Sequence, residues 1–145
     1  MANAQTSLSD TLEQRFPWCA DHGDALRTLF LGYTERKREH NVVDYDDLLL
    51  YWRALLGSEA AESVRGLFDH VLVDEYQDTN KIQADILFDL CGPDGNLTAV
   101  GDDAQSIYSF RAARVENILE FTQRYPSASV VALEQNYRST PEILD

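Results

Sequence analysis

The sequence predicts an α/β protein in which a helical segment precedes a unit of alternating strands and helices. Over residues 1–66 the apolar side chains recur at helical spacing. Further along, short apolar runs at 68–73, 97–100 and 130–133 are separated by two helical patterns. This order implies parallel strands joined by right-handed crossovers, with helices flanking the sheet. We therefore divide the chain into a helical segment, 1–66, and a parallel-sheet unit, 67–145.

The composition suits one folded domain with a small appendage. The chain has 145 residues, of which 44% are hydrophobic, and this is enough for a core and too many for a disordered chain. No apolar run reaches the length that spans a bilayer, and the polar stretch Met1–Asp10 does not resemble a secretory signal. Cys19 and Cys91 show no metal-ligand spacing, which favours two reduced thiols. These features predict a cytoplasmic protein.

The charge balance limits what this stretch of protein binds by itself. The formal net charge is −13, from 25 acidic and 12 basic residues. Because contacts to phosphate need Lys and Arg, the excess of carboxylates predicts weak intrinsic binding to nucleic acid. The same balance fits a module whose basic surfaces lie on other parts of a larger protein.

The helical segment has clear start and stop signals. Ser9 or Asp10 is suited to cap a short first helix. Asp44 is suited to cap a later helix that ends at Gly57, and the charged run at 35–39 is expected on a solvated helix face. The apolar positions at helical spacing are Ala25, Leu26, Leu29, Phe30 and Tyr33, and then Leu48, Leu49, Trp52, Leu55 and Leu56.

Two more helices separate the predicted strands, and a third follows them. The stretch 92–96 is a strong turn signal, and Ser139 or Thr140 is suited to cap a helix with Pro141 in its first turn. The apolar positions of the two intervening helices are Ile82, Ile86 and Leu90, and then Val115, Ile118, Leu119 and Thr122.

The most informative stretch is 71–80, where an apolar, β-branched run ends in two adjacent carboxylates. Asp74 and Glu75 follow Val73 directly. A buried parallel strand delivers acids in this way to the carboxyl edge of a sheet, where α/β proteins bind ligands. One carboxylate is then able to hold Mg²⁺, and its neighbour to orient or deprotonate an attacking water. An acid pair after a strand is common, but the full run Asp-Glu-Tyr-Gln-Asp-Thr-Asn is much more specific.

A second polar cluster follows the predicted strand at 97–100. Gln105 both donates and accepts hydrogen bonds, so it is suited to contact a phosphate oxygen or a water. Tyr108 and Phe110 precede Arg111, and aromatic side chains beside a cation suit base stacking with a backbone contact. An isolated Phe, in contrast, more often closes a core. The spacing from Gln105 predicts that Phe110 and Arg111 lie together at the rim of the same edge.

A third cluster follows the predicted strand at 130–133. Arg138 is suited either to stabilise charge on a transferred phosphate or to form a surface ion pair. The acids expected at this edge of the sheet are Asp74, Glu75, Asp78, Asp102 and Asp103. Such crowding is unfavourable unless cations compensate, and Mg²⁺, Arg138 and a lysine from elsewhere would do so.

These motifs resemble, in their order and in their residue sequences, those of the UvrD/Rep/PcrA family of superfamily 1 DNA helicases. The stretch 71–80 is similar to the Walker B motif (motif II), 100–111 to motif III and 133–140 to motif IV. The stretch 43–49 resembles the segment that leads from the helical insertion to the first motor domain. The resemblance implies a partial RecA-like P-loop NTPase domain. Residues 1–66 would end insertion subdomain 1B and return to motor domain 1A, and the remainder would be the C-terminal part of 1A.

The resemblance also implies roles at an ATP site. Asp74 would be the Mg²⁺ ligand, Glu75 the base that activates water, and Gln105 the sensor of the γ-phosphate. Tyr137 would stack on the adenine, and Arg138 would act as an arginine finger. The whole protein would be an ATP-dependent 3′→5′ helicase or translocase that acts on single-stranded and duplex DNA. Tyr108, Phe110 and Arg111 would couple the ATP site to single-stranded DNA.

The sequence departs from the family pattern before residue 71. It has no Gly-rich loop ending in Gly-Lys-Ser or Gly-Lys-Thr, and nothing after Asp145 supplies a second motor domain. We therefore expect a central portion of a helicase that needs the missing domains as partners and hydrolyses little ATP alone. In the family fold the phosphate-loop strand lies between the strands that end at Val100 and Leu133. Without it, either the strand at 130–133 pairs directly with the strand at 97–100, or a gap is left with unpaired backbone N–H and C=O groups. An exposed edge of this kind predicts self-association.

Two alternatives remain open from the sequence. The first is a non-catalytic binding or scaffold module from a split or decayed helicase. The second is a Mg²⁺-dependent nuclease or phosphotransferase that uses the paired carboxylates, although this leaves the second and third motifs unexplained. A neighbouring reading frame with the phosphate loop would favour a split helicase, and metal-dependent cleavage by this chain would favour a nuclease.

Overall fold

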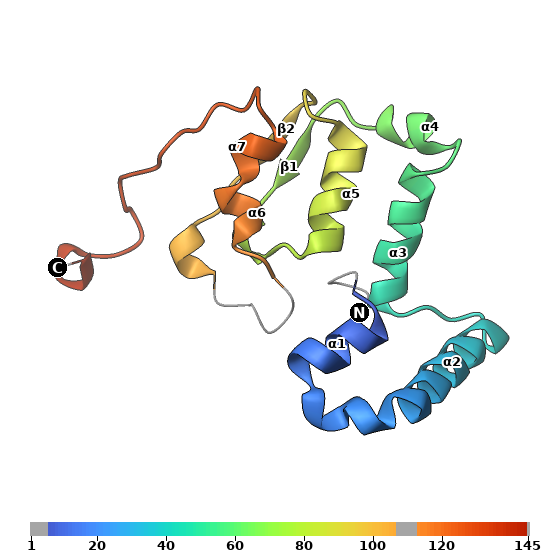
Figure 1. Cartoon of the computed structure of the whole chain (residues 1–145). Coiled ribbons are helices and arrows are strands. Elements are labelled where there is room, and N and C mark those ends of the chain that lie inside the picture. The colour runs from blue at the N-terminus through green and yellow to red at the C-terminus, as the bar shows by residue number, and fades with distance from the viewer. Residues whose placement is uncertain (1–5, 107–112, 145) are drawn as a thin grey trace.

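The computed structural model describes residues 6–106 and 113–144, and it places helices before a small α/β unit (Figure 1). The helices before residue 66 are α1 (Leu8–Arg15), α2 (Gly23–Glu39), α3 (Tyr45–Leu56) and α4 (Ala61–Arg65), with a 3₁₀ turn at Pro17–His22. The elements after it are β1 (Val71–Val73), α5 (Lys81–Cys91), β2 (Leu97–Ala99), α6 (Glu116–Leu119), α7 (Phe121–Arg124) and α8 (Pro141–Leu144). Two further 3₁₀ turns lie at Tyr76–Asp78 and Asp103–Gln105.

The two strands pair in parallel, with α5 in the connection between them. Val71 lies opposite Leu97 and Val73 opposite Ala99. The hydrogen-bonded ladder continues beyond the strands, because the Val100 N–H donates to the Val73 carbonyl at 2.8 Å. This confirms the strand–helix–strand order predicted from the first two apolar runs, and it brings the ends of both strands to one edge.

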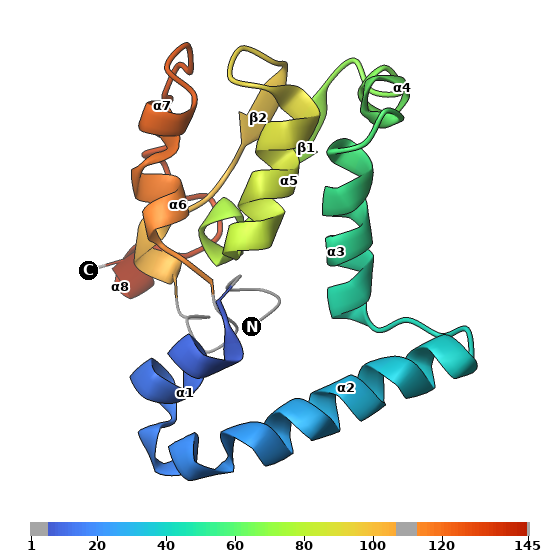
Figure 2. The same ribbon diagram turned by 45° about the vertical axis from the view of Figure 1, so that its right-hand side comes forward.

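Helix α5 forms the centre of the core, between the sheet and α3 (Figures 1 and 2). Ile82, Ile86 and Leu90 are all buried, and Leu56 of α3 packs against them. Each such side chain contributes about 1.5–3 kcal/mol through its burial. The predicted spacing by four residues on α5 is therefore confirmed as the core face.

Capping side chains set where α3 and α5 begin. At the start of α5 the Asn80 side chain accepts the Gln83 N–H at 3.0 Å, and the Gln83 side chain accepts the Asn80 N–H at 2.9 Å. Asp44 caps α3 in the same reciprocal way, and Gly57 follows its last residue, as predicted. The first helix starts earlier than expected, because Ser7 rather than Ser9 or Asp10 is the cap.

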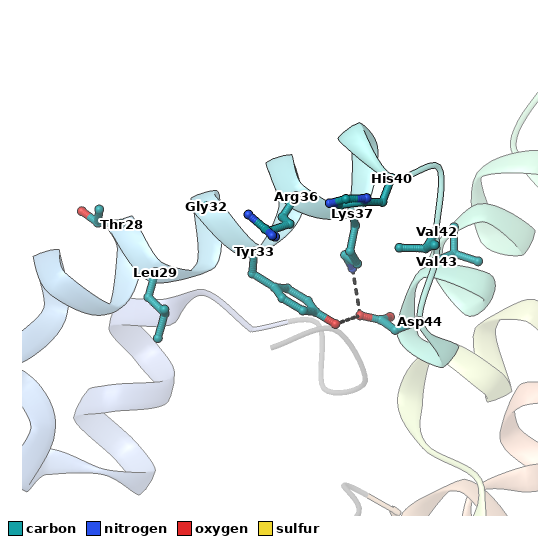
Figure 3. Close-up of a pocket in the computed structure, with 10 residues that line it drawn as sticks. All are labelled: Thr28, Leu29, Gly32, Tyr33, Arg36, Lys37, His40, Val42, Val43 and Asp44. Carbon is teal, nitrogen blue, oxygen red and sulfur yellow. Dashed lines mark hydrogen bonds and ion pairs between the residues drawn. The ribbon is translucent and has the colours of Figure 1, made fainter.

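Lys37 departs from the predicted solvated face of the charged run. Its side chain is 14% exposed, and its Nζ lies 2.8 Å from Asp44 and 2.6 Å from Asp47. The Tyr33 hydroxyl donates to the same Asp44 carboxylate, so two side chains of α2 hold the start of α3 (Figure 3). These hydrogen bonds raise the pKa of Lys37 and lower the pKa of Asp44. The prediction was wrong here because one position per turn of the run faces the next helix.

The predicted third strand is also wrong. Residues 130–133 are irregular, and Val130, Val131 and Leu133 are 75%, 77% and 84% exposed. A strand exists only through pairing, and in the described part of the chain the sheet contains β1 and β2 alone. An apolar run cannot form a strand by itself when no neighbouring strand lies alongside.

Two smaller differences concern element boundaries. The helix predicted through 115–122 is interrupted at Glu120, which has φ −97° and ψ 10°, and this divides it into α6 and α7. The interruption accompanies edge-on packing of Phe121 against Tyr76, with 5.1 Å between ring centroids. The first strand begins at Val71 rather than at residue 68.

Both cysteines are free and half-buried, as the sequence predicted. Within 6–106 and 113–144, no helix combines the length and apolar character that crossing a membrane requires.

Candidate functional site

The carboxylates predicted after β1 lie at the carboxyl edge of the sheet. Asp74 and Glu75 are both exposed, and an Asp74 side-chain oxygen accepts the Glu75 N–H at 2.9 Å. Glu75 has φ 52° and ψ 44°, the left-handed conformation. For a residue other than glycine this conformation costs roughly 1–2 kcal/mol. The backbone turns sharply there and enters the 3₁₀ turn at Tyr76–Asp78.

A recess of about 410 Å³ opens beside these carboxylates. Residues of β1, the following turn, α3 and α5 line it, including Trp52, Asp74, Glu75, Asp78, Thr79 and Gln83. The Asp78 Oδ1 atom is buried and has no hydrogen-bond partner among the described residues. The recess therefore presents several carboxylate oxygens to whatever occupies it.

The loop after β2 meets the same edge. An Asp102 side-chain oxygen accepts the Ala104 N–H at 3.0 Å, and the other accepts the Gln105 side-chain amide at 2.7 Å. Gln105 is exposed. Its amide thus lies against Asp102 and makes no hydrogen bond to Asp74 or Glu75 within the described part of the chain.

Gln77 joins the two loops. It is 1% exposed, its amide nitrogen donates to the Glu75 carboxylate at 2.7 Å, and its amide oxygen accepts the Asp102 N–H at 3.0 Å. Gln77 belongs to the first motif, but no role was predicted for it from the sequence. The only sequence signal for a role was a polar residue two positions after Glu75. The second partner of Gln77 could not be predicted, because it lies in a loop that is remote in sequence.

Gly101 is required for close approach at this junction. A Cβ atom there would lie 2.6 Å from the Gln77 amide oxygen and 2.8 Å from a methyl carbon of Ile118. Both distances are shorter than van der Waals contact. The glycine therefore lets the second loop lie directly on the Gln77 side chain.

The chain that follows the second loop returns to the first motif. The Arg114 N–H donates to the Thr79 carbonyl at 3.1 Å, and the Asn117 side chain donates to the same carbonyl at 2.9 Å. Thr79 and its neighbour Asn80 are buried. These contacts fix both sides of the second loop relative to the first.

Among the described residues, Tyr137 and Arg138 form no hydrogen bond or ion pair with this edge. Tyr108, Phe110 and Arg111 lie outside the described residues. Tyr137 is 86% exposed and its hydroxyl contacts Gln135. Arg138 is exposed and lies in the irregular segment before α8. Within the described residues, no hydrogen bond or ion pair connects it to Asp74 or Glu75. Its predicted role stays a prediction.

A larger recess, of about 920 Å³, lies away from the carboxylates along α2 and the turn into α3 (Figure 3). Its lining includes Leu29, Tyr33, Val42 and Val43. The ion pair between Lys37 and Asp44 closes one side of it. It contains none of the side chains predicted to take part in catalysis.

Fold and site together define a partial α/β domain of the RecA-like helicase type, preceded by helices. The family model for the UvrD/REP helicase N-terminal domain matches residues 2–126. The chain belongs to this family.

Individual relatives agree with the family model. The chain is 39% identical to the ATP-dependent DNA helicase UvrD1 of Mycobacterium bovis, over 99% of this chain and 21% of the relative. It is 40% identical to the ATP-dependent DNA helicase PcrA of Staphylococcus epidermidis, over 86% of this chain and 17% of the relative. The chain thus spans about one fifth of the length of the curated relatives that it matches.

Proposed function

We propose that the chain is part of a cytoplasmic ATP-dependent 3′→5′ DNA helicase or translocase. The observation that carries this proposal is the pair Asp74 and Glu75 at the carboxyl edge of β1, joined through Gln77 to the loop after β2. The relatives are named ATP-dependent DNA helicases, which supports the same function. In this proposal residues 1–66 end subdomain 1B and enter motor domain 1A, and residues 67–145 form the C-terminal part of 1A.

The residues present fit a bound Mg²⁺ ion that is shared with phosphate. Mg²⁺ in nucleotide sites takes one or two carboxylates and completes its shell with phosphate oxygens and water. Asp74 is exposed at the sheet edge, and Asp78 in the same recess has a buried oxygen without a partner among the described residues. Asp74 would hold the ion, which when bound would neutralise charge on the phosphates.

Glu75 would accept the proton of the attacking water. Its carboxylate is held by the Gln77 amide at 2.7 Å, and a positioned carboxylate is a suitable base. Gln105 would sense the γ-phosphate from the second loop. Tyr137 would stack on adenine and Arg138 would stabilise charge in transfer, once the segment that carries them folds over the site.

The isolated chain should bind Mg²⁺-ATP only weakly. The sequence lacks the Gly-Lys-Ser or Gly-Lys-Thr loop whose N–H groups and lysine hold the β- and γ-phosphates. Calorimetric titration of the 145-residue chain should give no saturation below about 1 mM nucleotide. The full-length helicase, titrated in parallel, should bind normally. Low-micromolar binding or clear turnover by the isolated chain would contradict this expectation.

Replacing Phe110 with alanine in the full-length protein tests the DNA-coupling role. If Phe110 stacks on a base, loss of the ring removes about 1–3 kcal/mol of binding per base. DNA-stimulated ATPase and unwinding should then fall while the melting temperature barely changes. Phe121→Ala is the matched control, since Phe121 packs against Tyr76 and Tyr125. That variant should lose stability instead. A large loss of stability in Phe110→Ala would show that Phe110 is a core residue.

Self-association of the isolated chain is expected at high concentration. Within the described residues, β1 and β2 pair only with each other, and Leu72 on the open face is 76% exposed. Unpaired edges beside exposed apolar side chains promote pairing between chains. Because the net charge of −13 opposes association, added salt should strengthen it. Light scattering measures the association, and the control variant Leu72→Lys should associate more weakly than the wild type. A monomer at every concentration and salt level would refute it.

A further inference from the structure

We infer that Gln77 is a positioning residue that links the Asp102 loop to the orientation of the Glu75 carboxylate. The inference rests on the proposed function, in which Glu75 accepts a proton from water. Gln77 itself touches no reacting atom in this scheme. It would act by holding Glu75 in one orientation and by moving it when the loop after β2 moves.

Both ends of the Gln77 amide are occupied by groups from different loops. The nitrogen donates to Glu75 at 2.7 Å and the oxygen accepts the Asp102 N–H at 3.0 Å. The amide is planar and rigid, so a shift of one partner changes the position available to the other. Gln77 is 1% exposed, so its own amide is shielded from solvent. Such a bond to a carboxylate is stronger than one between neutral groups.

The surroundings leave the Gln77 side chain little room to adapt. Gly101 lies so close that a Cβ atom would fall 2.6 Å from the amide oxygen. The Tyr76 N–H, next to Gln77, donates to the Val100 carbonyl at 2.9 Å. The two loops are therefore held together in two ways. One is the backbone hydrogen bond between Tyr76 and Val100, and the other is the pair of hydrogen bonds made by the Gln77 side-chain amide.

The contacts continue from Gln77 to the exposed surface of the second loop. Asp102 offers its N–H to Gln77 and a carboxylate oxygen to the Gln105 amide, at 3.0 Å and 2.7 Å. A change at Gln105 is thus able to reach Glu75 through Asp102 and Gln77. Coupling along this path is measured between pairs of residues.

The test uses two substitutions of Gln77 in the full-length helicase. Gln77→Met removes donor and acceptor at similar volume. Gln77→Glu keeps an acceptor for the Asp102 N–H, but it turns the contact with Glu75 into repulsion. Both variants should lower kcat for ATP by about 10²-fold, as expected for a misplaced catalytic group. The KM for ATP should change by no more than about two-fold, because ground-state binding is untouched.

The coupling between Gln77 and Gln105 is measured separately. In a double-mutant cycle with Gln105→Ala, the losses in DNA-stimulated kcat should be clearly non-additive when combined with Gln77→Met. Gly101→Ala should produce a similar fall in kcat, because its methyl group displaces the same amide. In the isolated chain, exchange of the Asp102 amide hydrogen should be slow in the wild type and in Gln77→Glu, and fast in Gln77→Met.

Leu90→Ala is the control for a merely structural role. Leu90 is a buried residue of α5 away from the recess, so its loss should lower stability without changing kcat at temperatures where the protein stays folded. Wild-type kcat in Gln77→Glu, or additive losses in the cycle, would overturn the inference. Glu75→Gln is assayed alongside. If that variant still hydrolyses ATP, the proposed role of Glu75 as the base fails, and the role of Gln77 in positioning it fails with it. If Glu75→Gln is inactive while Gln77→Met is not, only the role of Gln77 fails.

Discussion

Replacing Glu75 with glutamine in the full-length helicase should abolish ATP hydrolysis while nucleotide binding survives. The substitution preserves the shape of the side chain and removes the proton acceptor, so the loss falls on kcat. Removing a positioned base costs on the order of 10²-fold or more in rate. Steady-state ATPase assays with saturating single-stranded DNA measure the loss, and equilibrium titration with a fluorescent ATP analogue measures binding.

An exposed glutamate outside the site provides the matched control. Glu116→Gln makes the same chemical change in α6, where its side chain is 55% exposed, and it should leave kcat unchanged. Substantial ATPase in Glu75→Gln would show that another group activates the water. Loss of nucleotide binding in that variant would show that Glu75 acts in binding rather than in the chemical step.

Replacing Asp85 with asparagine should cause a large loss of stability. Asp85 is 8% exposed, and three cations surround its carboxylate: Lys81 at 2.7 Å, Arg124 at 2.8 Å and Arg53 at 3.0 Å. Removing one partner from a buried ion pair costs about 3–5 kcal/mol. The three cations retain solvent access, so we expect about 2–3 kcal/mol here. Urea denaturation of the isolated chain measures the change.

The pH dependence of stability gives the same prediction a second readout. Burial raises the pKa of Asp85, but hydrogen bonds from Lys81 and Arg124 outweigh it and hold the pKa below its ordinary value. Its stabilising effect is therefore complete above the ordinary carboxyl pKa, near 3.9. The effect is lost as pH falls through the lower pKa of the folded state. In Asp85→Asn, this part of the fall in the free energy of unfolding at low pH should be absent.

Asp89 supplies the control for Asp85. Among the described residues its carboxylate forms an ion pair with Arg53 alone, at 2.6 Å, and its side chain is 31% exposed. Asp89→Asn should therefore cost less than about 1 kcal/mol. Equal losses in the two variants would mean that the charge cluster around Asp85 contributes no more than an ordinary surface ion pair.

Local patterns predicted α3 and α5 because the responsible interactions are close in sequence. The first two apolar runs form strands because each is the other's partner in the sheet. The caps at Asp44 and Gly57 and the four-residue spacing on α5 act within a turn or two. The run at 130–133 failed because strand formation depends on a partner that sequence pattern does not supply. The same limit applies to Lys37, whose inward orientation depends on carboxylates of the next helix.

The site shows the same division between local and remote contributions. The arrival of Asp74 and Glu75 at the sheet edge follows from a strand that ends in acids, and the sequence predicted it. Gln77 was missed as a link because its second partner, Asp102, lies 25 positions away. The central place of Asp85 was missed for a similar reason, since two of its three cations come from α3 and α7.

The left-handed backbone at Glu75 has a consequence for engineering this protein. At φ 52° and ψ 44°, glycine or asparagine would be accommodated with less strain than glutamate. A search that ranks substitutions by folding free energy alone is therefore biased against the residue that the proposed chemistry needs. Thermostabilised variants of this chain should keep position 75 fixed, and they should gain their stability from surface positions remote from the sheet edge.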